Sequence, residues 1–381
     1  MNNLYFDIAA TTPLDENVAK LISEVQSNVF GNPSSIHQFG QKSRAIVEKS
    51  RRQIANALYC KPNEIIFTSG GSESNNLVLH GFLKTGDHFI TSSYEHPAII
   101  KVAQELENNG VEVSYIKPEK NGIINPEKIN NTIKENTKLI SIMYVNNELG
   151  CINPIQEIID IAKKNNIKTH TDAVQLIGKK HINLNDLKTD FLSIAAHKYY
   201  GPKGIGALFI RSGTLLNTVF QGGGQEQNIR PGTENISGIA GMGLATKIAI
   251  ENIEKNYTAI TQLENLFFDL VKRKNILFKL NGDNRLSGII NITFSNILGQ
   301  NLVMKLDMKG IAISFGSACS SGTPKPSSVL LDLGLTEQDA LKTVRISIGK
   351  MHTKEDVVKL VDSLNQIIKD TCNKDVITHV N

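Results

Sequence analysis

Short apolar segments alternate with amphipathic ones from about residue 64 to residue 211. Most of the apolar segments are followed by a helix-like stretch, such as HPAIIKVAQELENNG or IQEIIDIAKKNN. This alternation predicts an α/β fold with a seven-stranded, mainly parallel sheet. The expected strands are EIIFTS (64–69), HFITSS (88–93), VEVSYIK (111–117), TKLISIMYV (137–145), IKTHTDA (167–173), FLSIAAHK (191–198) and IGALFIR (205–211).

The last two expected strands are joined by residues 199–204 alone. A parallel crossover needs a longer connection, so we expect the final strand to run antiparallel to a neighbour.

The second half of the chain has a different pattern. Residues 236–274 predict a long helix pair, and KEDVVKLVDSLNQIIKD predicts a final helix. Strands are expected near NGDNRLSGIINITFS and TVRISIG. A chain of 381 residues is too long for one small core. We therefore expect a large domain at 12–255 and a smaller α/β domain formed by 1–11 and 256–381.

Composition narrows the class of protein. Hydrophobic residues make up 40% and charged residues 20%, as in ordinary soluble proteins. The formal net charge of +4, without a dense Lys/Arg block, gives no reason to expect direct nucleic-acid binding. The N-terminus lacks the apolar run of a signal peptide, and no segment has the length of a membrane span. The sequence therefore predicts a cytoplasmic protein without membrane association.

The four cysteines are scattered along the chain and form no motif with histidine. We therefore expect neither a metal site nor a disulfide framework.

Polar residues follow five of the expected strands. In open α/β sheets, ligands bind beyond the carboxyl ends of the strands, so these residues are expected to face one crevice. They are Gly70-Gly71-Ser72, His96, Asn146, Asp172 with Gln175, and His197-Lys198.

Each of these residues alone has an ordinary structural explanation. Gly70-Gly71 could be only a tight turn, His96 and Asp172 could be helix caps, and most lysines are solvated. Lys198, however, closes the apolar run FLSIAAH, which places it at the crevice.

The set as a whole fits the chemistry of pyridoxal 5′-phosphate (PLP). This cofactor needs a lysine for a Schiff base and a carboxylate at the pyridine nitrogen. Its phosphate would bind at a glycine turn that opens a helix. The turn lacks the G-K-[ST] sequence of a nucleotide P-loop.

With these residues, the chain resembles the NifS/IscS-type cysteine desulfurases of the class V aminotransferase family, which are fold type I PLP-dependent transferases. The resemblance covers nearly the whole chain. The matching segments are YFDIAATTPLD (5–15), FGNPSSIH (30–37), FTSGGSESNN (67–76), EHPAI (95–99), VNNELG (145–150), HTDAVQ (170–175), HKYYGPKGIGAL (197–208), RPGTEN (230–235), GSAC (316–319) and VRISIG (344–349).

The resemblance implies roles for the cofactor site by position. Lys198 would carry the Schiff base and His96 would stack on the ring. Asp172 would hold the pyridine nitrogen and Gln175 the phenolic oxygen. The phosphate would lie on Gly71, Ser72 and His197, with Thr233 reaching the site of a partner subunit in a homodimer.

The resemblance also implies the reaction. Asn146 and Arg345 would bind the carboxylate of L-cysteine, and Cys319 would take the sulfur as a persulfide while alanine forms. Cys319 lies in the small polar segment SFGSACSSGTPKPSS, which is typical of a mobile loop. Cys60, Cys151 and Cys372 are interpreted as structural or incidental.

One position departs from the family pattern. The family usually has a phosphate-binding serine three residues before the lysine, and here that residue is Ala195. We therefore expect one phosphate contact to be missing.

Three other functions remain open at this stage. They are selenocysteine lyase activity, aminotransferase activity on the same scaffold, and a non-catalytic role in a sulfur-assembly complex. The sulfur acceptor is expected to be a protein, such as an iron–sulfur scaffold or a tRNA thiolation protein.

Overall fold

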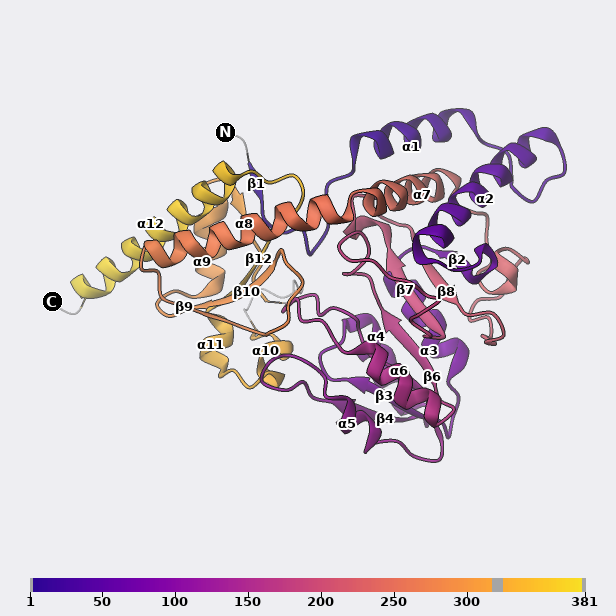
Figure 1. The fold of residues 1–381 in the computed structure, drawn as a ribbon, viewed down its shortest axis with the longest axis horizontal. Coiled ribbons are helices and arrows are strands. Elements are labelled where there is room, and N and C mark those ends of the chain that lie inside the picture. The colour runs from indigo at the N-terminus through magenta and orange to yellow at the C-terminus, as the bar shows by residue number, and fades with distance from the viewer. Residues whose placement is uncertain (1–2, 317–324, 379–381) are drawn as a thin grey trace.

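The computed structural model describes residues 3–316 and 325–378. Its central feature is a seven-stranded sheet with the order β2-β8-β7-β6-β5-β3-β4 (Figure 1). The strands are β2 (Ile65–Thr68), β3 (His88–Ser92), β4 (Glu112–Ile116), β5 (Thr137–Ser141), β6 (Lys168–Asp172), β7 (Phe191–Ala195) and β8 (Gly206–Ile210).

The strand directions are those predicted from the sequence. β8 runs antiparallel to both of its neighbours, β7 and β2, and the other pairs are parallel. The prediction of a mainly parallel sheet with one reversed strand is confirmed. The expected strands were longer at their carboxyl ends than the observed ones, because residues such as 142–145 continue beyond the ladder as a buried apolar loop.

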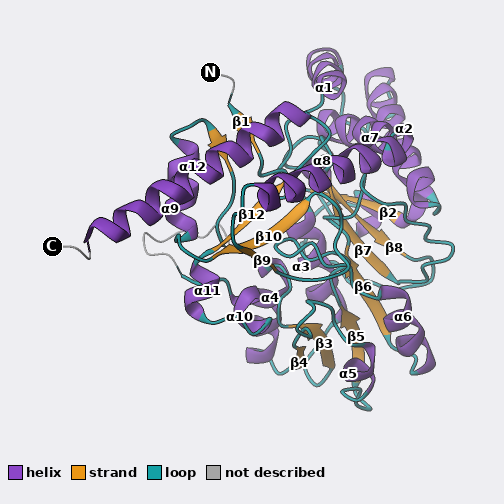
Figure 2. Ribbon diagram, turned by 60° about the vertical axis from the view of Figure 1, so that its left-hand side comes forward, coloured by secondary structure: helices purple, strands orange, loops and turns teal. Residues whose placement is uncertain are grey.

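Both faces of this sheet are covered by helices (Figure 2). Adjacent strand residues point to opposite faces, so Ile65 joins one apolar core and Ile66 another. The helices of this region are α1 (Glu16–Asn28), α2 (Gln38–Leu58), α3 (Gly71–Phe82), α4 (Pro97–Asn108), α5 (Pro126–Asn130), α6 (Ile155–Lys164) and α7 (Ile236–Glu251), with the 3₁₀ turns η1 (Pro62–Glu64), η2 (Ala196–Lys198) and η3 (Glu226–Asn228).

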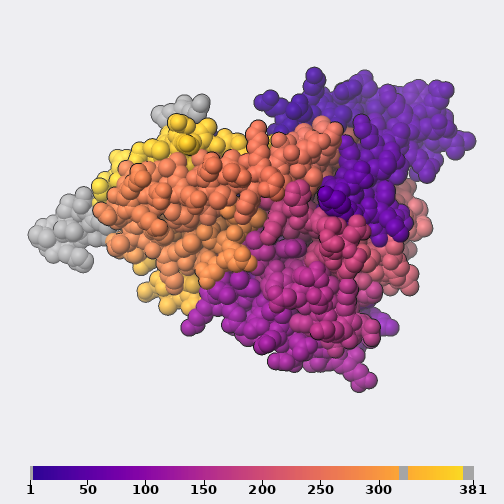
Figure 3. Space-filling model, in the orientation of Figure 1, coloured from indigo at the N-terminus to yellow at the C-terminus, as the bar shows by residue number. Residues whose placement is uncertain are grey.

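The C-terminal part of the chain forms a second lobe, seen in orange and yellow beside the indigo-to-magenta part (Figure 3). Its antiparallel sheet has the order β12-β10-β9, and β1 pairs in parallel with β11. The elements are β1 (Leu4–Tyr5), β9 (Phe278–Leu280), β10 (Ile289–Phe294), β11 (Ile311–Ala312) and β12 (Thr343–Ser347), with α8 (Ile253–Arg273), α9 (Gly299–Asp307), α10 (Ser328–Asp332), α11 (Glu337–Leu341) and α12 (Lys354–Thr378).

This second lobe has its own apolar core, which includes Phe6, Phe267 and Ile346. The expected helix pair corresponds to α7 and α8, and α8 leads from the large sheet into the second lobe (Figure 1). Domain boundaries at residues 11/12 and 255/256 stay a prediction.

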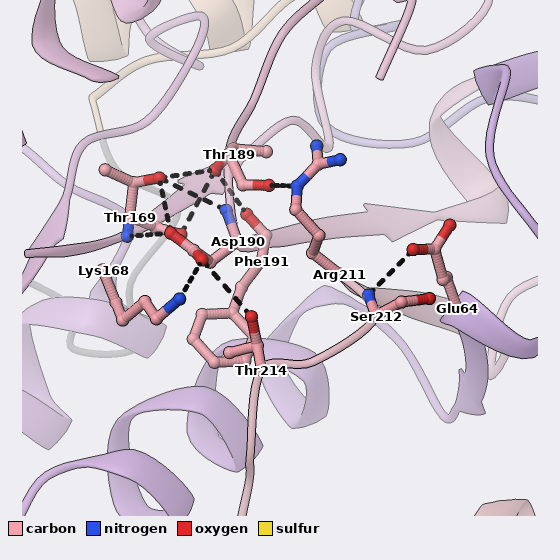
Figure 4. Close-up of polar contacts among 9 residues, drawn as sticks. All are labelled: Glu64, Lys168, Thr169, Thr189, Asp190, Phe191, Arg211, Ser212 and Thr214. Carbon is pink, nitrogen blue, oxygen red and sulfur yellow. Dashed lines mark hydrogen bonds and ion pairs between the residues drawn. The ribbon is translucent and has the colours of Figure 1, made fainter. Parts of the chain in front are cut away.

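A polar network fixes the amino ends of β6 and β7, away from the strand ends that carry the candidate residues (Figure 4). Asp190 accepts hydrogen bonds from Lys168 Nζ at 2.7 Å and the Thr169 backbone N at 3.0 Å. Arg211 Nε donates to the Thr189 carbonyl at 2.7 Å. These charged groups are held by one another, so we interpret the network as structural.

No helix within residues 3–316 and 325–378 is both long enough and apolar enough to cross a membrane.

Candidate active site

The candidate residues gather where the parallel strands end. β6 ends at Asp172, β7 leads directly into the 3₁₀ turn that contains Lys198, and α3 begins at Gly71. Asp172 and Lys198 lie close enough to His96 to influence the pKa of its imidazole, and Asp172 also influences the pKa of the Lys198 amine. The structure therefore brings together the three residues that the sequence placed at the centre of the site.

Lys198 is held by the N-terminal segment of the chain. Its Nζ donates hydrogen bonds to the carbonyl oxygens of Ala9 at 2.7 Å and Ala10 at 2.8 Å. Burial and the nearby Arg345 guanidinium lower the pKa of this amine to about 8, although Asp172 acts in the opposite direction. Near neutral pH a larger fraction of the amine is therefore neutral and nucleophilic than in an ordinary lysine.

Asp172 is a buried carboxylate with two donors. Oδ2 accepts a hydrogen bond from Asn75 Nδ2 at 2.8 Å, and Oδ1 accepts one from the Val174 backbone N at 3.0 Å. These donors give both carboxylate oxygens a hydrogen-bond partner in a site that excludes most water. Asn75 was not predicted from the sequence, although its position early in α3, shortly after the glycines, could have suggested it.

His96 is fixed as the N-cap of α4. Its Nδ1 accepts a hydrogen bond from the Ala98 backbone N at 3.1 Å, which assigns the ring proton to Nε2. Burial lowers the pKa of the imidazole; Asp172 opposes this shift and Lys198 adds to it. A neutral imidazole with a fixed tautomer can exchange protons at Nε2.

Gln175 and Lys198 donate hydrogen bonds to the same backbone carbonyl. Gln175 Nε2 donates to the Ala9 carbonyl at 2.8 Å, the same oxygen that accepts a hydrogen bond from Lys198. Its Oε1 accepts a hydrogen bond from Lys179 Nζ at 3.0 Å. Lys179 was not predicted from the sequence, although its spacing of four residues from Gln175 is the only signal that could have indicated it.

The start of α3 forms a possible anion site against β7. A Cβ atom at Gly71 would lie 2.8 Å from Val174 Cγ2, so only glycine allows this close approach. The first N–H groups of a helix lack partners within the helix and attract phosphate. Ser72 is exposed there, and the Ala195 methyl group lies beside Gly71, 3.9 Å from where such a Cβ atom would stand.

His197 and Ser193 flank the same region. His197 Nδ1 lies 3.1 Å from Thr11 Oγ1, and burial with nearby Lys198 lowers the pKa of its imidazole to about 4. Ser193 Oγ instead contacts His170 Nε2 at 3.0 Å inside the core. As expected from its place one strand step deeper, the Ser193 hydroxyl is directed away from the anion site.

The assignment of Asn146 to substrate binding has to be corrected. Asn146 is fully buried, its Nδ2 donates to the Tyr94 carbonyl at 3.1 Å, and its Oδ1 accepts from the backbone N of Glu148 and Leu149 at 2.9 and 2.8 Å. Its amide is therefore used up in stabilising the turn. The partly exposed Asn147 is the better candidate, because its carbonyl accepts a hydrogen bond from Arg345 Nη1 at 2.9 Å.

Arg345 lies on β12 and faces the large sheet's crevice. Its Nη2 pairs with Asp7 at 2.7 Å, and its buried Nε has no hydrogen-bond partner among the residues that the structure describes. An orphaned guanidinium N–H next to Lys198 is a suitable donor for a carboxylate ligand.

Thr233 and the cysteines are the remaining predicted residues. Thr233 is exposed in the loop before α7. Cys319 lies outside the described residues. Burial raises the pKa of both the Cys60 and the Cys151 thiol to about 12, so neither is a thiolate near neutral pH.

Comparisons with known proteins agree on one family. The family model described as aminotransferase class-V matches residues 4–360. The chain is 43% identical over 372 residues to a protein of Dictyoglomus turgidum named cysteine desulfurase IscS, covering 96% of this chain and 94% of that one.

Solved structures are similar as well. A NifS-like protein superposes with a TM-score of 0.91 at 32% identity, over 97% of this chain and all of the other. A structure described as SspA in complex with cysteine superposes with a TM-score of 0.82 at 37% identity, over 92% of this chain and all of the other.

Proposed function

Because the chain belongs to the aminotransferase class-V family and is a cysteine desulfurase within it, we propose that it binds PLP where β6, β7 and α3 meet. The main support is the buried amine of Lys198, which shares the site with the Asp172 carboxylate. Enzymes of this family depend on PLP in general. The fold is accordingly that of the fold type I PLP-dependent transferases.

The donor set fits this cofactor. Lys198 supplies the amine for its aldehyde, and Asp172 supplies a buried carboxylate for its pyridine nitrogen. The start of α3, Ser72 and His197 would hold the phosphate. The Gln175 amide would face the phenolic oxygen.

When bound, PLP supplies a ring that withdraws electrons from the α-carbon of an attached amino acid. The side chains of the protein would bind the substrate and transfer protons. Asp172 would keep a proton at the ring nitrogen, Arg345 and Asn147 would hold the substrate carboxylate, and the neutral fraction of Lys198 would accept a proton. His96 Nε2 exchanges a second proton on the ring face.

Sulfur transfer is assigned to Cys319. Its thiolate would attack the sulfur of L-cysteine, forming an S–S bond while the C–S bond of the substrate breaks. The electron pair of that bond stays with the substrate carbon, which takes up a proton and leaves as alanine. Cys319 retains the sulfur as a persulfide for a protein acceptor.

We also propose that the enzyme is a homodimer with shared sites. Support comes from exposed apolar side chains in the α1–α2 connection and the first turn of α2, where Phe30, Ile36 and Phe39 are 76%, 92% and 59% exposed. Such a patch is typical of an interface. Thr233, exposed on its own subunit, would reach the partner's phosphate. The sulfur-accepting protein and a cytoplasmic location stay predictions from the sequence.

The direct test is to incubate the enzyme with L-cysteine, quantify alanine, and map the persulfide by mass spectrometry. We expect equal alanine and persulfide in the first turnover, with the persulfide on Cys319. Cys319→Ala should bind PLP but form no persulfide, whereas Cys60→Ala and Cys151→Ala should behave as wild type. A persulfide on another cysteine, or alanine formation only with selenocysteine, would contradict the assignment.

A further inference from the structure

A second lysine lies within reach of the cofactor site that no step above requires. Lys179 follows Gln175 by four residues in the turns after β6. Its Nζ donates to Gln175 Oε1 at 3.0 Å, and Lys179 lines a cavity that Lys198 also lines. Lys179 and Lys198 therefore reach the edge of the same cavity from different turns.

Lys179 has no acidic partner among the described residues. The carboxylate that lines the same cavity, Asp15, is paired with Lys350 at 2.8 Å. The other nearby cation, Arg345, is paired with Asp7. Burying an amine without a counter-ion costs free energy. The hydrogen bond to the Gln175 amide oxygen, the one side-chain contact of Lys179 in the described part of the chain, therefore calls for a functional explanation.

The reason is the orientation of the Gln175 amide. An amide side chain can turn over so that its oxygen and nitrogen exchange places, and its neighbours decide which way it stands. Lys179 can only donate when charged, so it fixes Oε1 on its own side. Nε2 then faces the Ala9 carbonyl and, beyond it, Lys198.

We propose that Lys179 is a positioning residue, which holds Gln175 with its donor end toward the phenolic oxygen of PLP. This inference rests on the proposed cofactor site. A reversed amide would present its oxygen to a phenolate, and two acceptors facing each other repel. Burial, with Lys198 and Arg345 nearby, lowers the pKa of Lys179 to about 7, but a neutral amine still has N–H groups to donate to Oε1.

The test compares Lys179→Met, which removes the donor at similar length, with Lys179→Arg, which keeps one. Lys180→Met, at the exposed neighbouring position, is the matched control. Apo-protein of each variant is titrated with PLP, and the pH titration of the visible absorbance is followed on the saturated protein. Thermal unfolding checks that each variant is folded.

We expect PLP to bind Lys179→Met about tenfold more weakly, as for loss of one hydrogen bond to a charged oxygen. The absorbance of Lys179→Met should titrate at a different pH from wild type, because phenolate stabilisation is lost. Lys179→Arg should stay within about threefold of wild type, and Lys180→Met should not change. In a Gln175→Leu background, Lys179→Met should have no further effect.

Unchanged PLP affinity and titration in folded Lys179→Met would overturn the proposal. If Lys179→Met does not fold, Gln175→Leu alone decides, because wild-type affinity in that variant would exclude the role of the amide. A wild-type protein that binds no PLP would instead refute the proposed function, so the two failures are distinguishable.

Discussion

Asn75 and Asp172 are joined by a hydrogen bond of 2.8 Å between the amide nitrogen of one and the carboxylate of the other. Asn75 is 1% exposed and Asp172 is 7% exposed, so water cannot readily replace either partner. The start of α3 thus has two functions in the proposed site. Its first N–H groups face the phosphate position, and its fifth residue stabilises the charge that would hold the cofactor ring.

Asn75→Leu should reduce turnover of L-cysteine by roughly tenfold or more, since a hydrogen bond to a charged group contributes about 1.5–3 kcal/mol. The physical reason is that Asp172 loses one of its two donors in a buried site. Steady-state alanine production measures the effect. Asn76→Leu is the control, because Asn76 Nδ2 donates to the Ser72 carbonyl on the helix surface. Equal activity of both variants would show that the Asn75 contact does not matter.

Lys198→Ala should lose the visible absorbance of the lysine-linked cofactor, because no other amine is held beside Asp172 in the same way within the described part of the chain. Purified wild-type protein is expected to be yellow. Lys203→Ala, at an exposed position five residues further on, should keep the wild-type spectrum. If the spectrum of Lys198→Ala is unchanged, another lysine is the anchor.

Ala195→Ser should slow the loss of PLP on dialysis of cysteine-treated enzyme, by about tenfold or more. The hydroxyl would stand beside Gly71 and add one contact to a charged phosphate, which is worth about 1.5–3 kcal/mol when geometry is good. Ser193→Ala serves as the control, since its hydroxyl contacts His170 and should not influence retention. Faster loss from Ala195→Ser would mean that the site is adapted to alanine.

Glu95→Gln should remove part of the pH dependence of stability. Burial raises the pKa of Glu95 to about 8, with nearby Asp172 adding to the shift, although Ser92 and the Met143 backbone N donate to its Oε1 at 2.5 and 2.9 Å. The folded protein thus keeps a proton that the unfolded chain releases near its usual pKa of about 4.5. The free energy of unfolding should therefore fall as pH rises between these two values.

Urea unfolding midpoints at several pH values from 5 to about 9 measure this dependence. Glu95→Gln carries no such proton, so its midpoint should fall less over the same range, by an amount equivalent to a few kcal/mol. Glu105→Gln, whose side chain is 61% exposed, is the control. Identical slopes for Glu95→Gln and wild type would show that Glu95 is ionised in the folded protein.

Mixed dimers of Lys198→Ala and Thr233→Ala subunits should retain one intact site of two. Each site would need Lys198 from one subunit and Thr233 from the other, so one of the two combinations is wild type. PLP bound per dimer, measured by absorbance after co-expression and separation by two tags, checks this. Each homodimeric variant should bind PLP more weakly at both sites, and an active monomer would exclude the arrangement.

The alternation of apolar and amphipathic segments was sufficient to predict the large sheet, because a parallel sheet buried on both faces needs continuous apolar strands. The ends of those strands then indicated Asp172 and Lys198. Which of the two residues Asn146 and Asn147 faces the site could not be predicted, because this depends on the hydrogen bonds of a turn that the sequence does not show.

Other site residues were missed because their role depends on distant contacts. Asn75 is an ordinary helix residue until β6 is placed beside it. Asp7 becomes relevant only because it meets Arg345, 338 residues further along the chain. The spacing of residues within a motif does not reveal pairs that are far apart in the sequence.

The N-terminal segment has a consequence for how the protein is made. Leu4 pairs with Ile311, and the Ala9 backbone N donates to Ser347 Oγ, whereas the Ala9 carbonyl holds Lys198. This segment therefore leaves the ribosome long before its strand partner β11, more than 300 residues further on, has been synthesised. The large sheet can form during translation. The segment that binds Lys198 through the Ala9 and Ala10 carbonyls is fixed only after β11 and Ser347 have been synthesised. A product truncated before β11 would therefore contain the folded sheet without a complete catalytic centre.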